Sequence, residues 1–144
     1  MRAFFDTSVL VAALVESHPA HNRAFPWLRR ALAGEMGFVV AGHTLLELYA
    51  VLTKLPVSPK ISPGIAYRLV SENIETTANV VSLSAEEYGQ VVKSMAQLNL
   101  GGGIVYDALL AKCAEKADAE RLLTLNPKDF IRVWPEGAGL IHAP

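Results

Sequence analysis

Short apolar runs alternate along the chain with longer stretches that mix hydrophobic and polar positions. The short runs predict buried strands, because a strand covered on both faces carries hydrophobic side chains at successive positions. The longer stretches predict helices with one buried face. The predicted strands are Arg2–Phe5, Gly37–Ala41, Asn79–Leu83, Leu122–Leu125 and, near the end of the chain, Gly139–His142.

The predicted helices begin and end at residues that favour helix termini. Gly34 ends the second helix, and Ser84-Ala-Glu-Glu is typical of a helix N-cap. The segment Pro56–Gly64 is predicted to be a loop, because its closely spaced prolines cannot sustain a helix. The predicted helices are Val9–Glu16, Pro19–Ala33, Thr44–Lys54, Ile65–Ile74, one that begins after Ser84, and Val105–Ala117.

This alternation of strands and helices predicts an α/β fold of three layers, in which helices cover both faces of a parallel sheet of four to five strands. The 144 residues suffice for one domain with a substantial core. No repeat, low-complexity tract or interdomain linker divides the chain, and the loop 56–64 is too short to separate two domains. We therefore expect a single domain over residues 1–144.

The composition is that of a globular protein, with 51% hydrophobic and 19% charged residues. Apolar runs such as Val9–Val15 are far shorter than the roughly 18 residues that a membrane span needs. Asp6 interrupts the only apolar segment that could begin a signal peptide. The single cysteine, Cys113, excludes an internal disulfide and is expected to be a small buried residue of a helix. A cytoplasmic location is therefore expected.

The formal net charge of −1 argues against strong non-specific binding to nucleic acid, since proteins that bind mainly to phosphates are usually more basic. A local basic rim around an acidic centre remains compatible with this charge. Arg23, Arg29 and Arg30 could belong to such a rim, although a solvated helix face explains them better. Trp27 and Trp134 are expected to be packed rather than free to stack on a base.

Three carboxylates stand in apolar stretches near the expected starts of helices: Asp6, Glu47 and Asp107. In an α/β sheet such strand–helix junctions converge on one edge. Two carboxylates about 5 Å apart repel by roughly 3 kcal/mol at an effective dielectric near 20, so such a cluster persists only when protonated or when it holds a cation. All-oxygen ligands suit Mg²⁺ or Mn²⁺. The three acids together therefore predict a metal site.

Each acid also has an ordinary structural explanation. Asp6 could cap the helix that follows it. Glu47 could form a capping box with Thr44, which would then be the N-cap residue. Asp107 could simply favour the positive end of a helix dipole. Any one of these explanations is reasonable alone, and the metal site is favoured because all three acids share the same kind of junction.

Histidines and hydroxyls indicate no second type of chemistry. His18 and His21 have a possible metal spacing, but the proline between them breaks the helical geometry and no third ligand lies nearby in the sequence. His43 could face the acidic site, although a solvated position in a loop explains it better. Ser8 and Thr124 are expected to support the acids or the ends of their elements rather than act as nucleophiles.

Four segments in chain order resemble the successive motifs of PIN-domain nucleases, and most of all those of the VapC-type toxins of bacterial toxin–antitoxin pairs. The resemblance spans essentially the whole chain and implies a PIN-like fold. It also implies that Asp6, Glu47 and Asp107 are the acidic triad that holds Mg²⁺ or Mn²⁺ for RNA cleavage. The four segments are Asp6-Thr-Ser-Val-Leu, Thr44-Leu-Leu-Glu47-Leu, Tyr106-Asp107-Ala-Leu-Leu-Ala and Leu123-Thr-Leu-Asn126-Pro-Lys-Asp129-Phe.

The last segment departs from the family pattern. The family often carries a fourth acid directly after the strand with which this segment begins. Here that place holds Asn126, a neutral and weaker ligand. Asp129 follows three residues later, so the resemblance leaves open which of the two completes the site. It also leaves open whether one or two metal ions bind, and one well-held ion is expected.

The resemblance further implies partners: an RNA substrate, a second copy of the chain in a homodimer, and a small VapB-like antitoxin. The C-terminal segment of that antitoxin would lie across the active site. The alternative is a PIN-like domain without catalysis that serves as a binding module. A metal-binding titration separates the two functions, because only the nuclease requires its acids to hold an ion.

Overall fold

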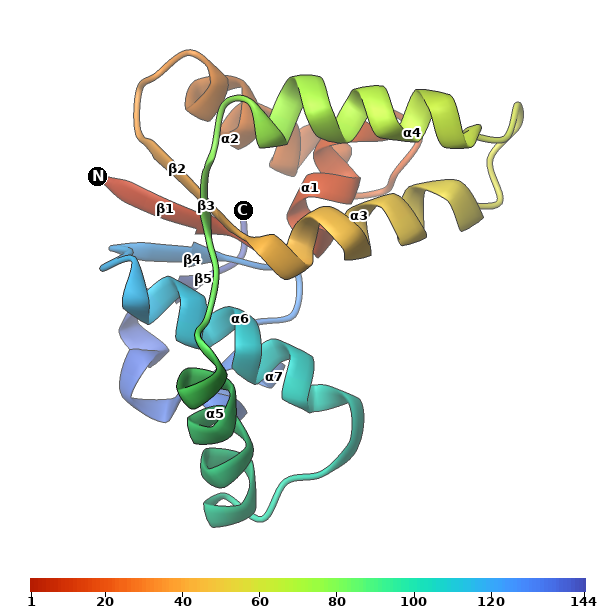
Figure 1. Cartoon of the computed structure of the whole chain (residues 1–144). Coiled ribbons are helices and arrows are strands. Elements are labelled where there is room, and N and C mark those ends of the chain that lie inside the picture. Colours follow the sequence, from red (N-terminus) through yellow and green to blue (C-terminus); the bar gives the residue numbers. More distant parts are fainter.

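A parallel five-stranded sheet forms the centre of the computed structural model, which describes all residues from 1 to 144 (Figure 1). The order of the strands in the sheet is β3-β2-β1-β4-β5. The α/β fold with a parallel sheet predicted from the sequence is therefore confirmed. The strands are β1 (Arg2–Phe5), β2 (Gly37–Ala41), β3 (Asn79–Val81), β4 (Arg121–Leu123) and β5 (Ile141–His142).

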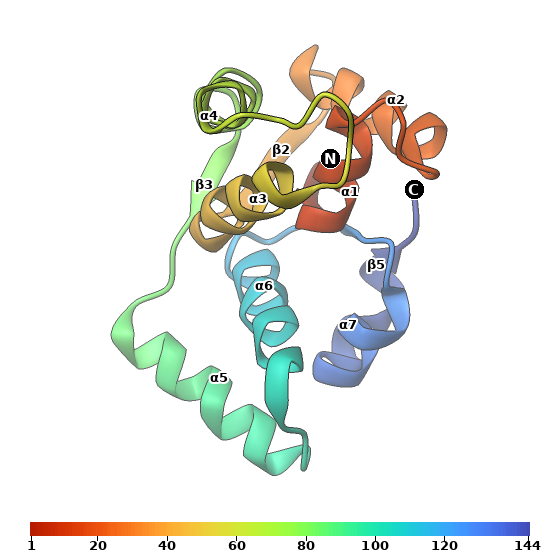
Figure 2. The same ribbon diagram turned by 90° about the vertical axis from the view of Figure 1, so that its right-hand side faces the viewer.

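Helices cover both faces of the sheet, as the two views show (Figures 1 and 2). One face carries α1 (Thr7–Leu14), α2 (His21–Leu32), α3 (Gly42–Lys54) and α4 (Pro63–Val70), and the other carries α5 (Ala85–Gln97), α6 (Val105–Lys116) and α7 (Pro127–Val133). Three short segments complete the chain: a π-helical turn at Ser71–Glu75 and 3₁₀ turns at Gly102–Ile104 and Pro135–Leu140.

Strands β1 to β4 send alternate side chains into two separate cores, because successive side chains of a strand point to opposite faces. In β1, Phe5 packs in the core beneath α1 to α4, while its neighbour Phe4 packs in the core beneath α5 to α7. The ring of Phe5 contacts that of Phe38 edge to face, with the centroids 4.9 Å apart. The sheet is thus buried on both faces, which explains why its strands read as continuous apolar runs.

The order of the strands places a topological switch point beside β1. The chain moves outward from β1 to β2 and β3, and then returns to the other side of β1 to form β4 and β5. In open α/β sheets, ligands bind at the carboxyl ends of the strands on either side of such a switch. The register pairs Phe5 of β1 with Leu123 of β4, so the residues that follow, Asp6 and Thr124, leave the sheet side by side.

Several boundaries differ from those predicted. Helix α3 begins at Gly42, two residues earlier than expected, and Pro63 begins α4 instead of closing the loop. The hydroxyl of Ser62 caps α4 by accepting a hydrogen bond from the backbone N–H of Ile65 at 3.2 Å. Strand β3 ends at Val81, two residues early. Helix α7 was not predicted.

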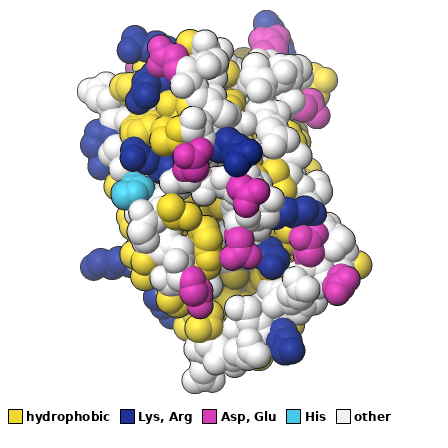
Figure 3. Space-filling model, turned by 90° about the vertical axis from the view of Figure 1, so that its left-hand side faces the viewer, with side chains coloured by type: hydrophobic (Ala, Val, Ile, Leu, Met, Phe, Trp, Pro, Cys, Tyr) yellow, Lys and Arg dark blue, Asp and Glu magenta, His cyan; other side chains and the backbone are white.

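The exterior carries interspersed acidic and basic side chains, and Figure 3 shows one such face. Many charges are already paired within the chain, such as Lys116 with Glu87 at 2.7 Å and Arg30 with Glu35 at 3.1 Å. Arg30 also lies 5.1 Å from the centre of the Trp27 ring. These contacts favour the solvated helix face over an RNA-binding rim for Arg30. No helix has the length and apolar character needed to cross a membrane.

Candidate metal centre

Asp6 lies directly after β1, where the chain turns into α1, and its side chain is 5% exposed. It is the N-cap residue of that helix by position, but its carboxylate makes no side-chain capping hydrogen bond. Instead, its Oδ2 accepts hydrogen bonds from Ser8 Oγ at 2.7 Å and from Thr124 Oγ1 at 2.8 Å. Asp6 therefore occupies the expected cap position, while its side chain binds Ser8 and Thr124 and makes no capping hydrogen bond.

The two hydroxyls also bind the segment that follows β4. Ser8 Oγ accepts a hydrogen bond from the backbone N–H of Leu125 at 3.1 Å, and Thr124 Oγ1 accepts one from that of Asn126 at 3.0 Å. Because these N–H groups occupy hydroxyl lone pairs, the hydroxyl protons are free to point at Asp6. Ser8 and Thr124 therefore position the carboxylate, as expected from the sequence, and neither hydroxyl proton is directed at a substrate.

Burial raises the pKa of Asp6 above its usual value, and the negative charge of Glu47 adds to this effect. The hydrogen bonds from Ser8 and Thr124 act in the opposite direction, because they stabilise the ionised carboxylate. Both hydroxyl bonds go to Oδ2, so neither hydroxyl occupies Oδ1. Asp6 thus has one oxygen that both hydroxyls hold in place and a second oxygen that receives no hydroxyl bond.

Asp107 lies in the first turn of α6 and is partly buried. Its pKa is raised to about 6, mainly by burial and in smaller part by the negative charges of Asp6, Asp129 and Glu47. The helix-dipole explanation of Asp107 holds for its position, since the first turn is the positive end of the helix. The dipole does not explain the raised pKa, which reflects burial first and the neighbouring carboxylates second. Three chain segments therefore bring acids near Asp107.

Glu47 lies in the second turn of α3, with Ala41 as the N-cap residue. Thr44 is consequently inside the helix, its buried hydroxyl has no hydrogen-bond partner, and the predicted capping box with Glu47 is wrong. The carboxylate instead lies 3.4 Å from Nε2 of His43, one turn earlier. His43 belongs to the helix and not to a loop, and its ring stacks on that of Tyr106.

Helix α7 brings one more acid to this edge. Asp129 lies in its first turn, 3.8 Å from Arg132, and its charge contributes to the raised pKa of Asp107. Asn126 is exposed at the N-cap position of α7, and its side chain makes no capping hydrogen bond. The sequence offered one signal for this helix, a proline at its first position. The helix is too short to show an amphipathic pattern.

The carboxylates do not form a closed ligand set as they stand, since no three His, Cys, Asp or Glu side chains lie close enough together to hold a metal ion. That Asp6, Glu47 and Asp107 share an ion therefore stays a prediction. The available donors fit a hard divalent cation, because they are all oxygens and one oxygen of the buried Asp6 has no hydroxyl donor.

Other residues considered from the sequence have structural roles. His18 Nδ1 accepts a hydrogen bond from the N–H of Ala20 at 3.0 Å, and His21 Nδ1 lies 2.9 Å from the carbonyl oxygen of Ala12. Neither histidine therefore has a free Nδ1 for a metal. Cys113 is buried, and burial raises the pKa of its thiol to about 11, so it is not a nucleophile.

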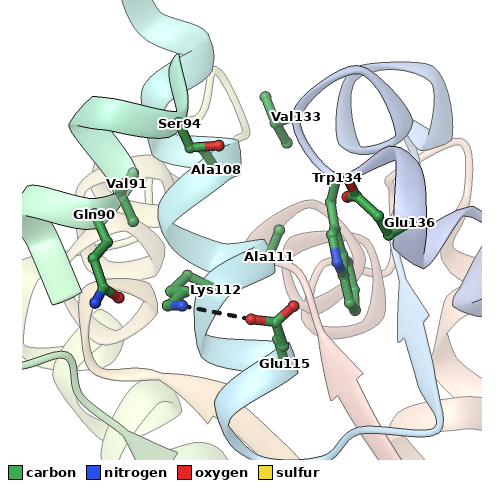
Figure 4. Close-up of a pocket in the computed structure, with 10 residues that line it drawn as sticks. All are labelled: Gln90, Val91, Ser94, Ala108, Ala111, Lys112, Glu115, Val133, Trp134 and Glu136. Carbon is green, nitrogen blue, oxygen red and sulfur yellow. Dashed lines mark hydrogen bonds and ion pairs between the residues drawn. The ribbon is translucent and has the colours of Figure 1, made fainter. Parts of the chain in front are cut away.

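A cleft of about 160 Å³ lies between α5, α6 and the end of α7 with the residues that follow it (Figure 4). Trp134 forms one wall, and Lys112 pairs with Glu115 across its floor at 3.5 Å. None of Asp6, Glu47, Asp107 and Asp129 lines it. The candidate metal centre is therefore the carboxyl edge of the sheet and not this cleft.

Comparison with known proteins identifies the family. The PIN domain family matches residues 3–133, which include all the acids described above. The chain belongs to the PIN-domain family. Two curated relatives of this PIN domain are ribonucleases of Mycobacterium tuberculosis. VapC27 is 36% identical over 115 residues, covering 80% of this chain and 78% of VapC27, and VapC40 is 33% identical over 117 residues, covering 81% of each.

Solved structures of PIN proteins have the same fold. A chain of VapBC2 from Rickettsia felis, crystallised with a DNA fragment from the promoter of its genes, aligns with a TM-score of 0.68 at 21% identity over 99% of this chain and 98% of that one. VapC20 of M. tuberculosis, described as a toxin that cleaves the sarcin–ricin loop, aligns with a TM-score of 0.64 at 16% identity over 83% and 86%. The resemblance to VapC-type PIN ribonucleases is thereby confirmed.

Proposed function

We propose that this PIN domain is a divalent-metal-dependent endoribonuclease and acts as the toxin of a toxin–antitoxin pair. The ribonuclease names of its relatives support the reaction class. The observation that carries the proposal is the buried Asp6 at the switch point, which two hydroxyls orient and whose pKa burial and the charge of Glu47 raise. A carboxylate kept there at such an electrostatic cost fits a cation site.

Asp6, Glu47 and Asp107 would hold the ion, with Asn126 or Asp129 as a further oxygen ligand. Mg²⁺ or Mn²⁺ is the ion that these donors suit. When bound, such an ion polarises a phosphodiester and lowers the pKa of a coordinated water. Asp129 is the stronger candidate for the further ligand, because its charge already acts on Asp107, whereas Asn126 is exposed.

The surrounding residues supply positioning and charge. Ser8 and Thr124 fix the orientation of Asp6, so that its free oxygen stays available without rearrangement. Lys128 and Arg132 lie on the exposed surface of α7, next to Asp129. Their charges offer contacts to RNA phosphates at the rim of an otherwise acidic edge.

Cleavage of labelled RNA by the purified chain tests the nuclease. Activity should require Mg²⁺ or Mn²⁺ and disappear with EDTA. Asp107→Asn should reduce the rate by at least about 100-fold, since a lost charge at the reacting centre costs several kcal/mol. Glu86→Gln, which removes an exposed carboxylate from α5, is the matched control and should cleave normally. Undiminished cleavage by Asp6→Asn/Asp107→Asn would refute the role of these acids, and a lack of cleavage by the unsubstituted chain would leave a non-catalytic binding module.

Two protein partners belong to the same proposal, a second copy of the chain and a small antitoxin. The structural neighbour VapBC2, which was crystallised with promoter DNA, supports the antitoxin. Exposed apolar side chains such as Tyr49 and Ile65 provide surface for a partner to bury. An arginine of the antitoxin would pair with the acidic edge and compete with metal or substrate phosphate. Light scattering of the chain alone, and with the antitoxin, measures both assemblies.

A further inference from the structure

Two aromatic side chains stack directly beside the acidic edge. The rings of His43 and Tyr106 are nearly parallel, with centroids 5.4 Å apart and an interplanar angle of 6°. His43 contacts Glu47 at 3.4 Å, and Tyr106 immediately precedes Asp107. Tyr106 is nevertheless 54% exposed, so much of its ring is left uncovered. The pair therefore joins two of the acids and presents an open aromatic surface next to them.

An apolar cleft of about 240 Å³ adjoins this pair on the side of His43. It lies where the start of α3 meets the end of β3, with α5 and α6 closing the other sides. Its lining includes His43, Leu46, Ser82, Leu83, Tyr88 and Leu109. None of its lining residues is an Asp, Glu, Lys or Arg. The cleft therefore suits a flat, neutral group with a few hydrogen-bonding atoms, and neither a phosphate nor a charged side chain.

Leu46 and Tyr88 line the cleft and face solvent, with exposed fractions of 74% and 49%. Two exposed apolar side chains of this size at one opening are costly unless a ligand covers them. The hydroxyls of Ser82 and Tyr88 and Nδ1 of His43, whose Nε2 faces Glu47, supply the polar contacts. A nucleobase has this chemistry: two apolar faces that stack on aromatic rings, and a polar edge.

We propose that the His43–Tyr106 pair and the adjoining cleft form a subsite for one unpaired nucleobase of the RNA. The inference rests on the proposed ribonuclease function, because it takes RNA as the ligand. It goes further by assigning Tyr106 and His43 as positioning residues. A base stacked there places the phosphate of its own nucleotide, or of the next one, at the acidic edge. Unpaired RNA would therefore be bound in preference to a duplex, whose bases are already stacked.

Binding of a short, fluorescein-labelled single-stranded RNA tests the subsite. Fluorescence anisotropy in EDTA measures Kd without cleavage. Tyr106→Leu keeps a large apolar side chain but removes the ring, and it should weaken binding by about 5-fold or more, since stacking on one base contributes about 1 to 3 kcal/mol. Tyr106→Phe keeps the ring and should restore the affinity. Tyr67→Leu changes an equally exposed tyrosine of α4, 64% exposed, and should leave Kd unchanged.

Two more measurements separate stacking from a general surface effect. The first uses an RNA in which one nucleotide near the cleavage position lacks its base. This RNA should have the same weak affinity for the unsubstituted chain and for Tyr106→Leu. With Mg²⁺ present, Tyr106→Leu should raise KM more than it lowers kcat, because the base is held in both the ground state and the transition state.

Equal RNA affinity of the unsubstituted chain and Tyr106→Leu would overturn the subsite, as would an equal loss in Tyr106→Phe or in Tyr67→Leu. If Tyr106→Leu instead weakens only the antitoxin complex, the aromatic surface serves a protein partner and the proposal is also overturned. Because anisotropy is read without metal, the two proposals fail separately. A chain that binds RNA through Tyr106 but never cleaves it would refute the nuclease alone.

Discussion

Asp6 combines two properties that oppose each other in the metal-free protein. Its side chain is almost fully enclosed, yet the hydroxyls of Ser8 and Thr124 are oriented to bind an ionised carboxylate. Asp107 is more exposed, and burial together with the further acids around it disfavours its ionised form. The sequence revealed which residue types gather here. It could not reveal the hydroxyl contacts, because the bond from Thr124 to Asp6 joins residues 118 positions apart.

The raised pKa of Asp107 predicts a pH dependence of stability in EDTA. The folded chain binds this proton more tightly than the unfolded chain, because the pKa rises from 3.8 to about 6 on folding. The stabilisation is therefore complete below about pH 4 and is lost as the pH rises through about 6. Asp107→Asn should flatten the dependence of Tm on pH across this window, measured by circular dichroism. An unchanged slope would contradict the assignment, and Glu86→Gln is the control.

The hydroxyl of Thr124 predicts a second effect, on metal affinity. Thr124→Val keeps the shape of this buried side chain but removes a donor to Asp6 and the acceptor for the N–H of Asn126. The apparent affinity for Mn²⁺ should fall about 10- to 100-fold, as for other groups that orient metal ligands. Stability should fall by about 1 to 3 kcal/mol. Titration calorimetry measures the first effect and urea unfolding the second.

Thr53→Val is a matched control, because the Thr53 hydroxyl binds only backbone carbonyls of its own helix, those of Tyr49 and Ala50. It should leave metal affinity unchanged. If Thr124→Val also binds Mn²⁺ normally, the hydroxyl is not a determinant of the site.

At the scale of the elements, the strands and long helices could be predicted because each buries a continuous apolar run or face. The start of α3 could not, since Gly42 and His43 carry no capping signal, and Thr44 is a plausible N-cap by residue type alone. That shift of two residues changed the interpretation of Glu47 from a capping residue to a residue in the second turn, and moved His43 from a loop onto the helix. Both outcomes depend on contacts with α6, such as the stack on Tyr106.

For helix α5, in contrast, a local sequence signal was sufficient to predict where the helix begins. Ser84 Oγ accepts a hydrogen bond from the N–H of Glu87 at 3.2 Å, and Glu87 Oε1 accepts one from the N–H of Ser84 at 2.8 Å. Ser84→Ala should cost about 1 kcal/mol and lower Tm by a few degrees. Differential scanning calorimetry measures the change. Ser94→Ala, on the same helix and without a hydrogen bond to its hydroxyl, should not lower Tm.

At the scale of the whole molecule, the acidic edge combines residues that follow strands on both sides of β1. The proposed toxin activity requires both sides. Expressing the chain alone should arrest bacterial growth, and co-expressing its antitoxin should relieve the arrest. Asp107→Asn should express to the same level without arrest, because the effect requires cleavage and not the mere presence of the fold. Colony counts after induction measure the outcome. Normal growth with abundant, metal-loaded protein would contradict the toxin role and leave the nuclease role intact.

Strands β1 and β4 are hydrogen-bonded neighbours, although they form near opposite ends of the chain. During synthesis, Asp6 and Glu47 leave the ribosome long before Thr124 and α7 do. Strand β1 then lacks one of its two neighbours, and contacts that close so long a loop form late in folding. The acidic edge is therefore completed only when nearly all of the chain has been made. A nascent or truncated chain therefore has no assembled edge, and the cleavage that we propose would begin only when synthesis is nearly finished.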